Sequence, residues 1–528
     1  MNARTWFPAV VLTLWAAFFG GAEPAFSEPQ RGGTLVYAVS MGEPTTYDCH
    51  AAASLTVMFR VAPHYSTLLQ IDPAAYPKIV GDVAESWEVS RDGLVYRFKL
   101  RPGIKFHDGS PLTSADVRAS YERMRNPPPG VVSVRKELLS DIASIETPDP
   151  RTVVFHLSNT NAAMLAIFAQ PYGCIYSEKL LQQDPSYPAK KVMGSGPFRF
   201  VRHTPGAEWV GERFAEYFRP GLPYLDGFKA LSLTPPATVN ALAAGQVMTD
   251  FRGVSRAEAE RIVAARGNKV QIFEANPAIS TLFYAAVNTQ RPGLNDPRVR
   301  RALALAMDHW EGSKALERSS TLSGVGGLAR PGSQFAASEA ELTRLPGFGR
   351  NIEAARAEAR RLLAESGHKD LKLTFLNRKS WPFLGVFLMD QLRQIGVTVV
   401  HEAPEDPQYF GRRKAGDYDL TLDVLPDYLD DPTVKWSIFV SADKNPANLV
   451  KASDKKLDEL YDLQSRTLDP KKRLALIREL EAYILNQGYC IPFFWGRRTT
   501  VVSSEMQGYV AAPTNYVGQD LADFWIKR

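Results

Sequence analysis

The chain has 528 residues, and its 62 Lys and Arg exceed its 57 Asp and Glu only slightly for this length. Without a basic patch of interleaved aromatic residues, this charge argues against a nucleic-acid-binding protein. A hydrophobic content of 45% is ordinary for a soluble globular protein, and the length allows two or three hydrophobic cores.

Residues 1–27 predict a signal peptide. A single basic residue precedes an apolar segment at 6–21, which is too short to span a membrane comfortably. Ala25 and Ser27 fit a signal-peptidase site, so we expect cleavage after Ser27, with cleavage after Ala22 as the alternative. An uncleaved anchor is the competing interpretation. Because no cysteine lies near this segment and no other apolar run approaches about twenty residues, we expect a secreted protein without a lipid anchor or an internal transmembrane helix.

The first half of the chain alternates in the manner of β-strands. Residues 33–39 predict a first strand, and 83–110 predict a β-meander. Three turn signals divide the meander: Arg-Asp-Gly, Arg-Pro-Gly and His-Asp-Gly. In the second of these, Pro102 presets φ and Gly103 supplies the positive φ that a type II turn needs. A further strand is predicted at 151–157.

A helix is predicted at 113–125. Thr113 is its expected N-cap, and Asp116 three residues later completes a capping box. The run Pro-Pro-Pro-Gly at 127–130 ends the helix. After a polar linker, Gly-Ser-Gly-Pro-Phe at 194–198 begins another strand.

The second half of the chain alternates strands and helices. Asp296 is the expected N-cap of a helix whose first turn contains Pro297. A strand at 371–376, a helix at 383–395 and a strand at 397–401 predict a β-α-β unit with a parallel strand pair and a right-handed crossover. The other expected elements are a strand at 283–288, helices at 352–366, 455–467 and 470–486, and a strand at 491–495.

Several segments together resemble one protein family. The markers are the meander 83–110 with its continuation 111–117, and the segments 194–198, 287–289, 296–302 and 491–493. They are similar to the signature of the large periplasmic binding proteins that feed peptide, nickel and related ABC importers, the family 5 extracellular solute-binding proteins. The resemblance covers nearly the whole mature chain.

This resemblance implies an α/β fold of the type II periplasmic-binding-protein class. Such a fold is a clamshell of two mixed α/β lobes joined by two extended hinge crossings, with lobe I enlarged by an extra β-rich subdomain. By analogy, lobe I combines 31–276 with the returning tail 496–528, and lobe II spans 280–490. The hinges are expected near 274–281 and 489–497.

The function implied by the resemblance is that of a periplasmic receptor of an ABC importer. It would capture a small polar ligand, in the first place a short peptide, and deliver it to an inner-membrane permease with its ATPase. Nickel chelates, opines, sugars and organic acids are alternative ligands, and a ligand sensor for membrane signalling is an alternative role. We expect a monomer with no cofactor and no nucleic-acid partner.

A secreted hydrolase is the rival class of protein. The chain contains Gly-Ser-Gly at 194–196 but lacks a Gly-x-Ser-x-Gly nucleophile elbow and a His-Glu-x-x-His zinc motif. Its 8 histidines are scattered without the spacing of metal ligands. We therefore expect no enzyme, no catalytic residue and no metal site.

Candidate ligand-binding residues follow the predicted strand 371–376. Ligands of open α/β sheets gather at the carboxyl ends of strands, where Arg378 can pair bidentately with a carboxylate and Trp381 can form an apolar wall. The resemblance implies the same role for Arg378, since dipeptide-binding relatives anchor the ligand's carboxylate with an arginine after the corresponding strand. A solvated loop cation is the alternative interpretation.

The acidic loop 424–432 contains a second candidate. The resemblance implies that Asp427 matches the first Asp of an Asp-Tyr-x-x-Pro-like motif, which in peptide binders meets the α-amino group. A buried carboxylate suits an ammonium because each offsets the other's desolvation. The chain has one extra residue before Pro432, so Asp430 is the alternative, and a surface acidic turn is the competing interpretation.

Tyr47 and His50 follow the first predicted strand, where the resemblance implies that relatives line the cleft; a purely structural role is the alternative. The three cysteines of the chain allow at most one disulfide. Cys49 and Cys174 are the expected pair because both lie in the N-terminal half, with Cys490 left free. Three buried thiols without a bridge are an equal alternative.

Overall fold

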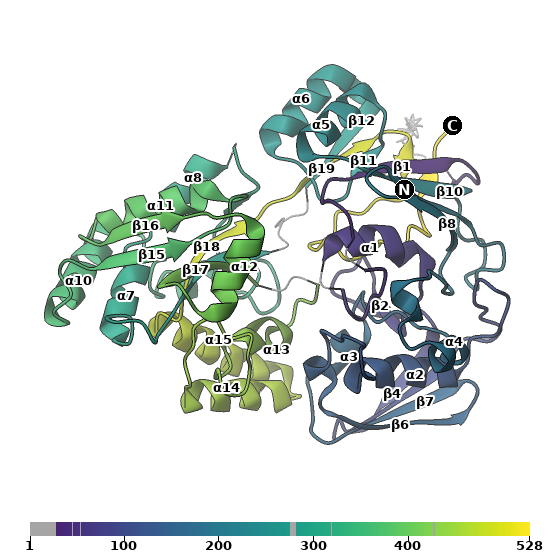
Figure 1. Ribbon diagram of the computed structural model, residues 1–528, viewed down its shortest axis with the longest axis horizontal. Helices are drawn as coiled ribbons and strands as arrows, with labels where there is room; N and C mark the ends of the chain where they lie inside the picture. Colours follow the sequence, from purple (N-terminus) through teal and green to yellow (C-terminus); the bar gives the residue numbers. More distant parts are fainter. Residues whose placement is uncertain (1–27, 45, 53, 275–280, 318, 426–427) are drawn as a thin grey trace, which may run out of the picture.

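Two large β-sheets organise the molecule, one in each of its two bodies (Figure 1). The computed structural model describes residues 28–528 except 45, 53, 275–280, 318 and 426–427. We call the body with the seven-stranded sheet lobe I and the body with the six-stranded sheet lobe II. The expected signal peptide at 1–27 lies outside the described residues.

The sheet of lobe I combines strands from distant parts of the chain. β1 pairs in parallel with β10 and β11, whereas β19, near the C-terminus, runs antiparallel to β11 and β12. The C-terminal part of the chain therefore returns to lobe I. The strand order is β12 (Val270–Glu274), β19 (Thr499–Ser503), β11 (Thr249–Asp250), β1 (Thr34–Val39), β10 (Gly227–Ser232), β9 (Glu208–Arg213) and β8 (Phe198–Thr204).

The sheet of lobe II contains the predicted β-α-β unit. β15 pairs in parallel with β16, and α11 connects them, which confirms the unit expected from the sequence. β15 also pairs in parallel with β17, so the carboxyl ends of these strands lie at one edge. The strand order is β14 (Leu322–Gly324), β18 (Cys490–Gly496), β13 (Leu282–Val287), β17 (Leu420–Val424), β15 (Lys372–Leu376) and β16 (Thr398–Glu402).

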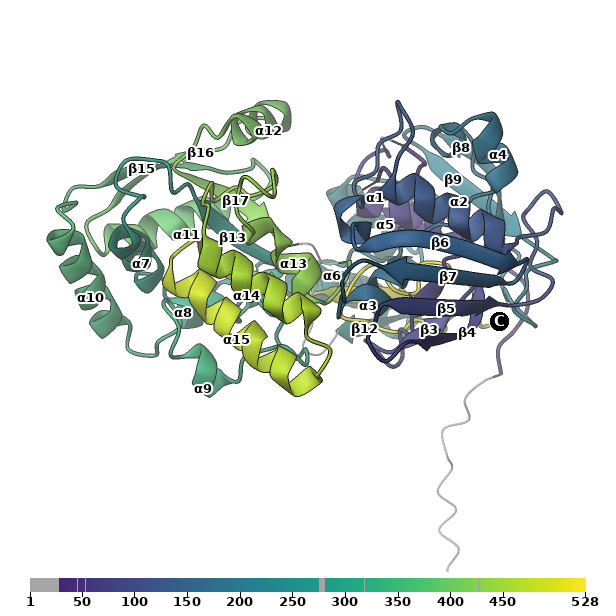
Figure 2. The ribbon, with the colours of Figure 1, turned by 90° about the horizontal axis from the view of Figure 1, so that it is seen from below.

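A third, four-stranded sheet enlarges lobe I, and Figure 2 shows its strands side by side beneath α2. Buried side chains of α2 and α3 share one hydrophobic core with this sheet. The predicted meander supplies its first two strands, and the glycines of the three predicted turns, at 93, 103 and 109, all have positive φ. The order is β4 (Ala84–Val89), β5 (Val95–Leu100), β7 (Thr152–Leu157) and β6 (Ile142–Asp149).

Helices cover the sheets, and two of them begin as predicted. The backbone N–H of Thr113 donates to Asp116 Oδ2 at 2.7 Å, which confirms the expected capping box, and Asp296 accepts from the N–H of Arg298 at 2.8 Å. The helices of lobe I are α1 (Leu55–Val61), α2 (Ser114–Arg125), α3 (Met164–Phe168), α4 (Glu178–Gln183), α5 (Pro235–Ala244) and α6 (Arg256–Arg266).

Lobe II carries the remaining helices. They are α7 (Pro297–Leu305), α8 (His309–Leu316), α9 (Glu339–Leu342), α10 (Ile352–Glu365), α11 (Pro382–Arg393), α12 (Asp406–Ala415), α13 (Pro432–Lys435), α14 (Lys455–Arg466) and α15 (Pro470–Asn486). Short two-stranded sheets, β2 (Leu69–Ile71) with β3 (Ile79–Gly81) and β20 (Met506–Gln507) with β21 (Trp525–Ile526), complete the fold. Within the described part of the chain, none of these helices combines the length and apolarity needed to cross a membrane.

The chain crosses between the lobes twice, and the two crossings lie side by side. It leaves lobe I after β12 and returns between β18 and β19, and β12 and β19 are paired antiparallel strands. The N–H of Gly496 donates to the carbonyl of Thr281 at 2.9 Å. Most of the expected range 489–497 belongs to β18 and thus to the sheet of lobe II, so the second crossing lies between the end of β18 and the start of β19. The hinge role of both crossings stays a prediction.

Candidate functional site

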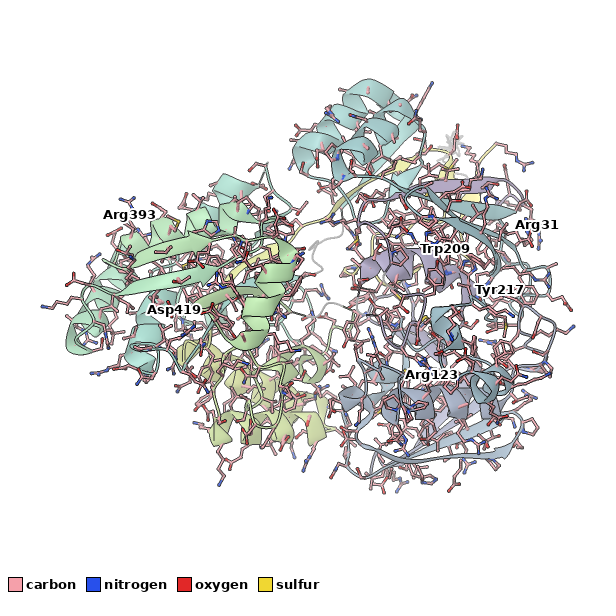
Figure 3. The ribbon with its side chains drawn as sticks, viewed as in Figure 1. Arg31, Arg123, Trp209, Tyr217, Arg393 and Asp419 are labelled. Atoms are coloured by element: carbon pink, nitrogen blue, oxygen red, sulfur yellow. A yellow bond between two sulfur atoms is a disulfide. The ribbon has the colours of Figure 1, made fainter. Side chains whose placement is uncertain are left out.

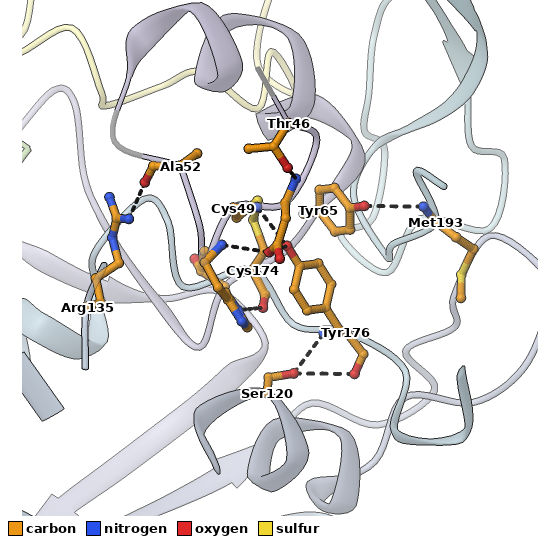
Figure 4. Close-up of a disulfide and its surroundings, with 12 residues drawn as sticks. Thr46, Cys49, Ala52, Tyr65, Ser120, Arg135, Cys174, Tyr176 and Met193 are labelled. Carbon is orange, nitrogen blue, oxygen red and sulfur yellow. Dashed lines mark hydrogen bonds between the residues drawn. A yellow bond between two sulfur atoms is a disulfide. The ribbon is translucent and has the colours of Figure 1, made fainter. Parts of the chain in front are cut away.

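The loop after β1 is held inside lobe I by a disulfide (Figure 4). Cys49 and Cys174 are bridged, with their Cα atoms 6.1 Å apart, whereas Cys490 is a free buried thiol. Asp48, next to the bridge, forms a buried ion pair at 2.5 Å with Arg123 of α2, which lies within lobe I (Figure 3). The loop is therefore anchored both covalently and by a buried charge pair.

His50 and Tyr47 have structural partners in this anchored loop. His50 is fully buried; its Nδ1 accepts from Arg123 at 3.0 Å, and its Nε2 lies 3.0 Å from the carbonyl of Cys174. Burial lowers the pKa of His50 to about 3, so the ring is neutral. The hydroxyl of Tyr47 lies 2.7 Å from Nδ1 of His203. Both side chains thus have hydrogen-bond partners within lobe I, and their contact with a ligand stays a prediction.

Arg378 lies at the carboxyl end of β15, as the sequence predicts. Its Nε and Nη2 donate to the carboxylate of Asp406, at the start of α12, at 3.2 and 2.7 Å. The guanidinium also lies 5.4 Å from the ring centroid of Phe410, and 34% of the side chain is exposed. Trp381 packs against Phe283 with ring centroids 4.6 Å apart. A ligand carboxylate at Arg378 would therefore compete with Asp406.

Asp430 belongs to a buried ion cluster. Its carboxylate lies 2.8 Å from Arg330 and 2.9 Å from Lys435, and all three side chains are at least nine-tenths buried. Burial alone would raise the pKa of Asp430, but Lys435 and Arg330 together lower it, so the carboxylate is charged. In this arrangement it neutralises two cations of lobe II. The other acidic candidate, Asp427, lies outside the described residues.

Three tyrosines and one arginine meet where the lobes touch, and we call them the seam cluster. Tyr428, between β17 and α13 of lobe II, has its ring centroid 5.9 Å from Tyr172 and 6.3 Å from Tyr516 of lobe I. The guanidinium carbon of Arg135, also in lobe I, lies 5.5 Å from the Tyr428 ring and 3.8 Å from the Tyr172 ring. Aromatic and cationic groups from both lobes therefore converge here.

Apolar contacts extend the seam beyond this cluster. Leu429 and Val434, which flank the start of α13, are each 1% exposed and belong to the hydrophobic core of lobe I's four-stranded subdomain. Nearby, the N–H of Ala162 donates to the carbonyl of Ser465 at 2.7 Å. The lobes are thus joined both at the crossings and along this contact.

A small open pocket, with a cavity volume of about 70 Å³, lies in lobe I beside the seam cluster. Tyr516 of the seam cluster and the disulfide residue Cys174 are among its lining residues. The polar side chains that line it are Thr67, Gln70, Asp82, Gln519 and Asp520. Apolar side chains, among them Met58, Ile71 and Val517, line the rest, so the pocket combines polar and apolar walls as small-molecule sites commonly do.

The sequence names candidates in the lobe II loops but gives no signal for Arg135, Tyr172 and Tyr516. Arg135 follows a proline-rich break and lies in no recognisable motif. The two tyrosines lie in irregular segments, where aromatic residues carry no periodic signal. Only their convergence in three dimensions marks them as candidates.

The family is shown by comparison with known proteins. Residues 78–446 match the family model described as bacterial extracellular solute-binding proteins, family 5 Middle. This match covers well over half of the chain. The protein belongs to the family 5 bacterial extracellular solute-binding proteins.

Relatives and solved structures agree with this assignment. The chain is 26% identical to a probable di/tripeptide-binding protein 5 of Pseudomonas aeruginosa, over 95% of this chain and 97% of the relative. It is 25% identical to a glutathione-binding protein of Salmonella typhimurium, over 96% and 98%.

Two solved structures are similar along most of the chain. The PBP AgaA of A. tumefaciens R10 in complex with agropinic acid is 25% identical, with a TM-score of 0.79 and coverage of 94% and 99%. The periplasmic binding protein DppA of Helicobacter pylori with peptide STSA has a TM-score of 0.80 at 22% identity, with the same coverage of both chains. The type II binding-protein fold expected from the sequence is confirmed.

Proposed function

We propose that this protein is the periplasmic receptor of an ABC importer and that it captures a short peptide between its two lobes. Family membership and the names of the di/tripeptide- and glutathione-binding relatives support this proposal. The observation that carries it is the seam cluster, where side chains of both lobes converge beside a pocket with polar and apolar walls. Such a site is completed only when the lobes come together.

The mechanism follows from this bilobed arrangement. A solute that contacts both lobes binds the closed form more tightly than the open form, and therefore shifts the population toward closure. A membrane permease with its ATPase can then distinguish the loaded receptor by the relative position of the lobes. The solute leaves unaltered, and residues 1–27 serve as the export signal.

Residues in two loops of lobe II are the proposed contacts on the other side of the solute. Arg378 and Trp381 stand at the carboxyl end of β15, and Asp427 and Asp430 are in the loop that leads to α13. We propose that Arg378 and Trp381 contact the solute, with Asp427 facing an ammonium group. Asp430, with its two cationic partners, supports the position of this loop.

A thermal-shift screen tests the function. Purified mature protein is mixed with short peptides, metal chelates, sugars and organic acids, including opines. A ligand at about 100 times its Kd adds about 2.7 kcal/mol to the unfolding free energy, which raises the melting temperature measurably. Stabilisation by peptides alone supports the proposal.

An opine is the second candidate solute, favoured by the similarity to the PBP AgaA in complex with agropinic acid. Stabilisation by agropinic acid without any response to peptides would select it. Conversion of a bound compound into product, followed by mass spectrometry, would contradict a receptor function altogether.

A further inference from the structure

Arg135 is a buried cation with few partners. The residue is only 2% exposed and lies in the loop between α2 and β6 of lobe I. Its Nη1 donates to the carbonyl of Ala52, and its Nε has no hydrogen-bond partner among the described residues (Figure 4). The guanidinium is stacked 3.8 Å from the centroid of Tyr172. Stacking leaves the N–H edge as the part that can donate further hydrogen bonds.

Other buried arginines are compensated more completely. Arg123 and Arg473 each pair with an aspartate, at 2.5 and 2.6 Å. Arg300 lacks a carboxylate partner among the described residues, but its guanidinium donates to three backbone carbonyls at 2.8 to 3.1 Å. Arg135 has one such carbonyl.

The groups that surround the charge of Arg135 are tyrosines. Burial lowers its pKa, and the groups that oppose this effect are the hydroxyls of Tyr428, Tyr172, Tyr516 and Tyr176. Within the described residues, no carboxylate neutralises it. An unpaired buried charge is costly, so an anion placed at its N–H edge gains a strong, charge-assisted hydrogen bond.

We propose that Arg135 binds a carboxylate of the captured solute, which makes the solute an anion or a zwitterion. The inference rests on the proposed function and deepens it. The position supports it, because Tyr428 of lobe II lies 5.5 Å from the guanidinium, so closing the lobes covers the ion pair. Removing water from around the pair strengthens the attraction between its charges. The carboxylate thereby favours the closed form.

Paired probes test this proposal. The dipeptide Met-Leu, the peptide Ser-Thr-Ser-Ala, glutathione and agropinic acid are titrated calorimetrically into the wild type, and each peptide is compared with its C-terminal amide. The variants are Arg135→Met, Arg135→Lys and, as a matched control at another buried arginine, Arg300→Met. Amidation and Arg135→Met should each weaken binding by at least about 30-fold, and Arg135→Lys by less. The amide lacks only the C-terminal carboxylate. Comparing acid with amide therefore tells whether Arg135 binds that group or a side-chain or opine carboxylate.

Stability measurements separate a ligand role from a packing role. Without ligand, Arg135→Met should keep or raise the melting temperature, because an apolar side chain replaces an uncompensated charge. Arg300→Met should lower it while keeping the preference for the acid over the amide. A lower melting temperature in Arg135→Met with unchanged affinity would identify an interlobe clasp and overturn the inference.

The remaining outcomes distinguish the inference from the function on which it depends. Equal affinity for acid and amide in the wild type, or loss of the preference in Arg300→Met, overturns the carboxylate assignment and leaves the receptor function standing. If none of the probes binds the wild type, the proposed peptide or opine receptor fails, and the assignment of Arg135 fails with it.

Discussion

Asp82 is a carboxylate that the fold keeps away from water. It is 6% exposed, its Oδ2 accepts from the N–H of Thr67 at 2.8 Å, and its Oδ1 has no partner among the described residues. Burial raises its pKa to about 7; Asp520 acts in the same direction, and Arg219 and Arg101 act against it. The folded protein thus holds this proton up to about pH 7, whereas an unfolded chain releases it near about pH 4.

Replacing Asp82 with Asn should therefore change how stability depends on pH. Between about pH 4 and 7 the folded state binds more protons at this site, so Asp82 makes the unfolding free energy fall as pH rises, by up to roughly 4 kcal/mol. Asp82→Asn keeps an acceptor for Thr67 and removes the titration. Urea unfolding should find the variant more stable than wild type at pH 8, with the difference shrinking or reversing at pH 5. An equal difference at both pH values would contradict the prediction.

At the scale of elements, the segment Gly-Ser-Gly-Pro-Phe that precedes β8 owes its glycines to close packing. A Cβ on Gly196 would lie 2.5 Å from backbone atoms of His64 and Tyr65, and one on Gly194 would lie 2.3 Å from the carbonyl of His64. The N–H of Gly196 donates to that same carbonyl at 3.0 Å. Neither glycine has a positive φ, so space rather than backbone conformation requires them.

Gly196→Ala should accordingly destabilise the protein by about 1–3 kcal/mol, because the new methyl group meets backbone that cannot yield cheaply. Differential scanning calorimetry would record the lower melting temperature. The matched control is Gly411→Ala within α12, where a Cβ meets nothing within 4 Å. There alanine should stabilise the helix by up to about 1 kcal/mol. A Gly196→Ala variant as stable as wild type would show that the segment can move away from His64.

Local signals account for the elements that the sequence predicted. The capping box at Thr113, the turn at Gly103 and the β-α-β unit around α11 depend on neighbouring residues, so they are legible without the fold. β6 is not predicted because a register shift between Ile142 and Ser144 places its two buried isoleucines three residues apart, and Pro148 interrupts it, which its place at the edge of the sheet tolerates. The meaning of Arg135 could not be predicted, since burial without a carboxylate partner is a property of the folded surroundings.

For the whole molecule, the balance between open and closed arrangements depends on contacts away from the crossings. Leu429 and Val434 follow the seam cluster's Tyr428 in the chain of lobe II, yet they are buried in the core of lobe I. Opening the lobes must expose them, at a cost of about 1.5–3 kcal/mol for each side chain. Solute binding is thus linked to the same contact that holds the lobes together.

Leu429→Ala should weaken that contact by about 2–5 kcal/mol and shift the receptor toward the open form. Small-angle scattering should then give a larger radius of gyration without ligand, and apparent affinity should fall in proportion to the closed fraction. A saturating peptide that binds the wild type should restore the compact form. The control Leu388→Ala, in the core of lobe II, should lower the melting temperature and leave the radius and affinity unchanged, because its side chain faces no interlobe contact. If Leu429→Ala behaves like this control, closure does not depend on the seam.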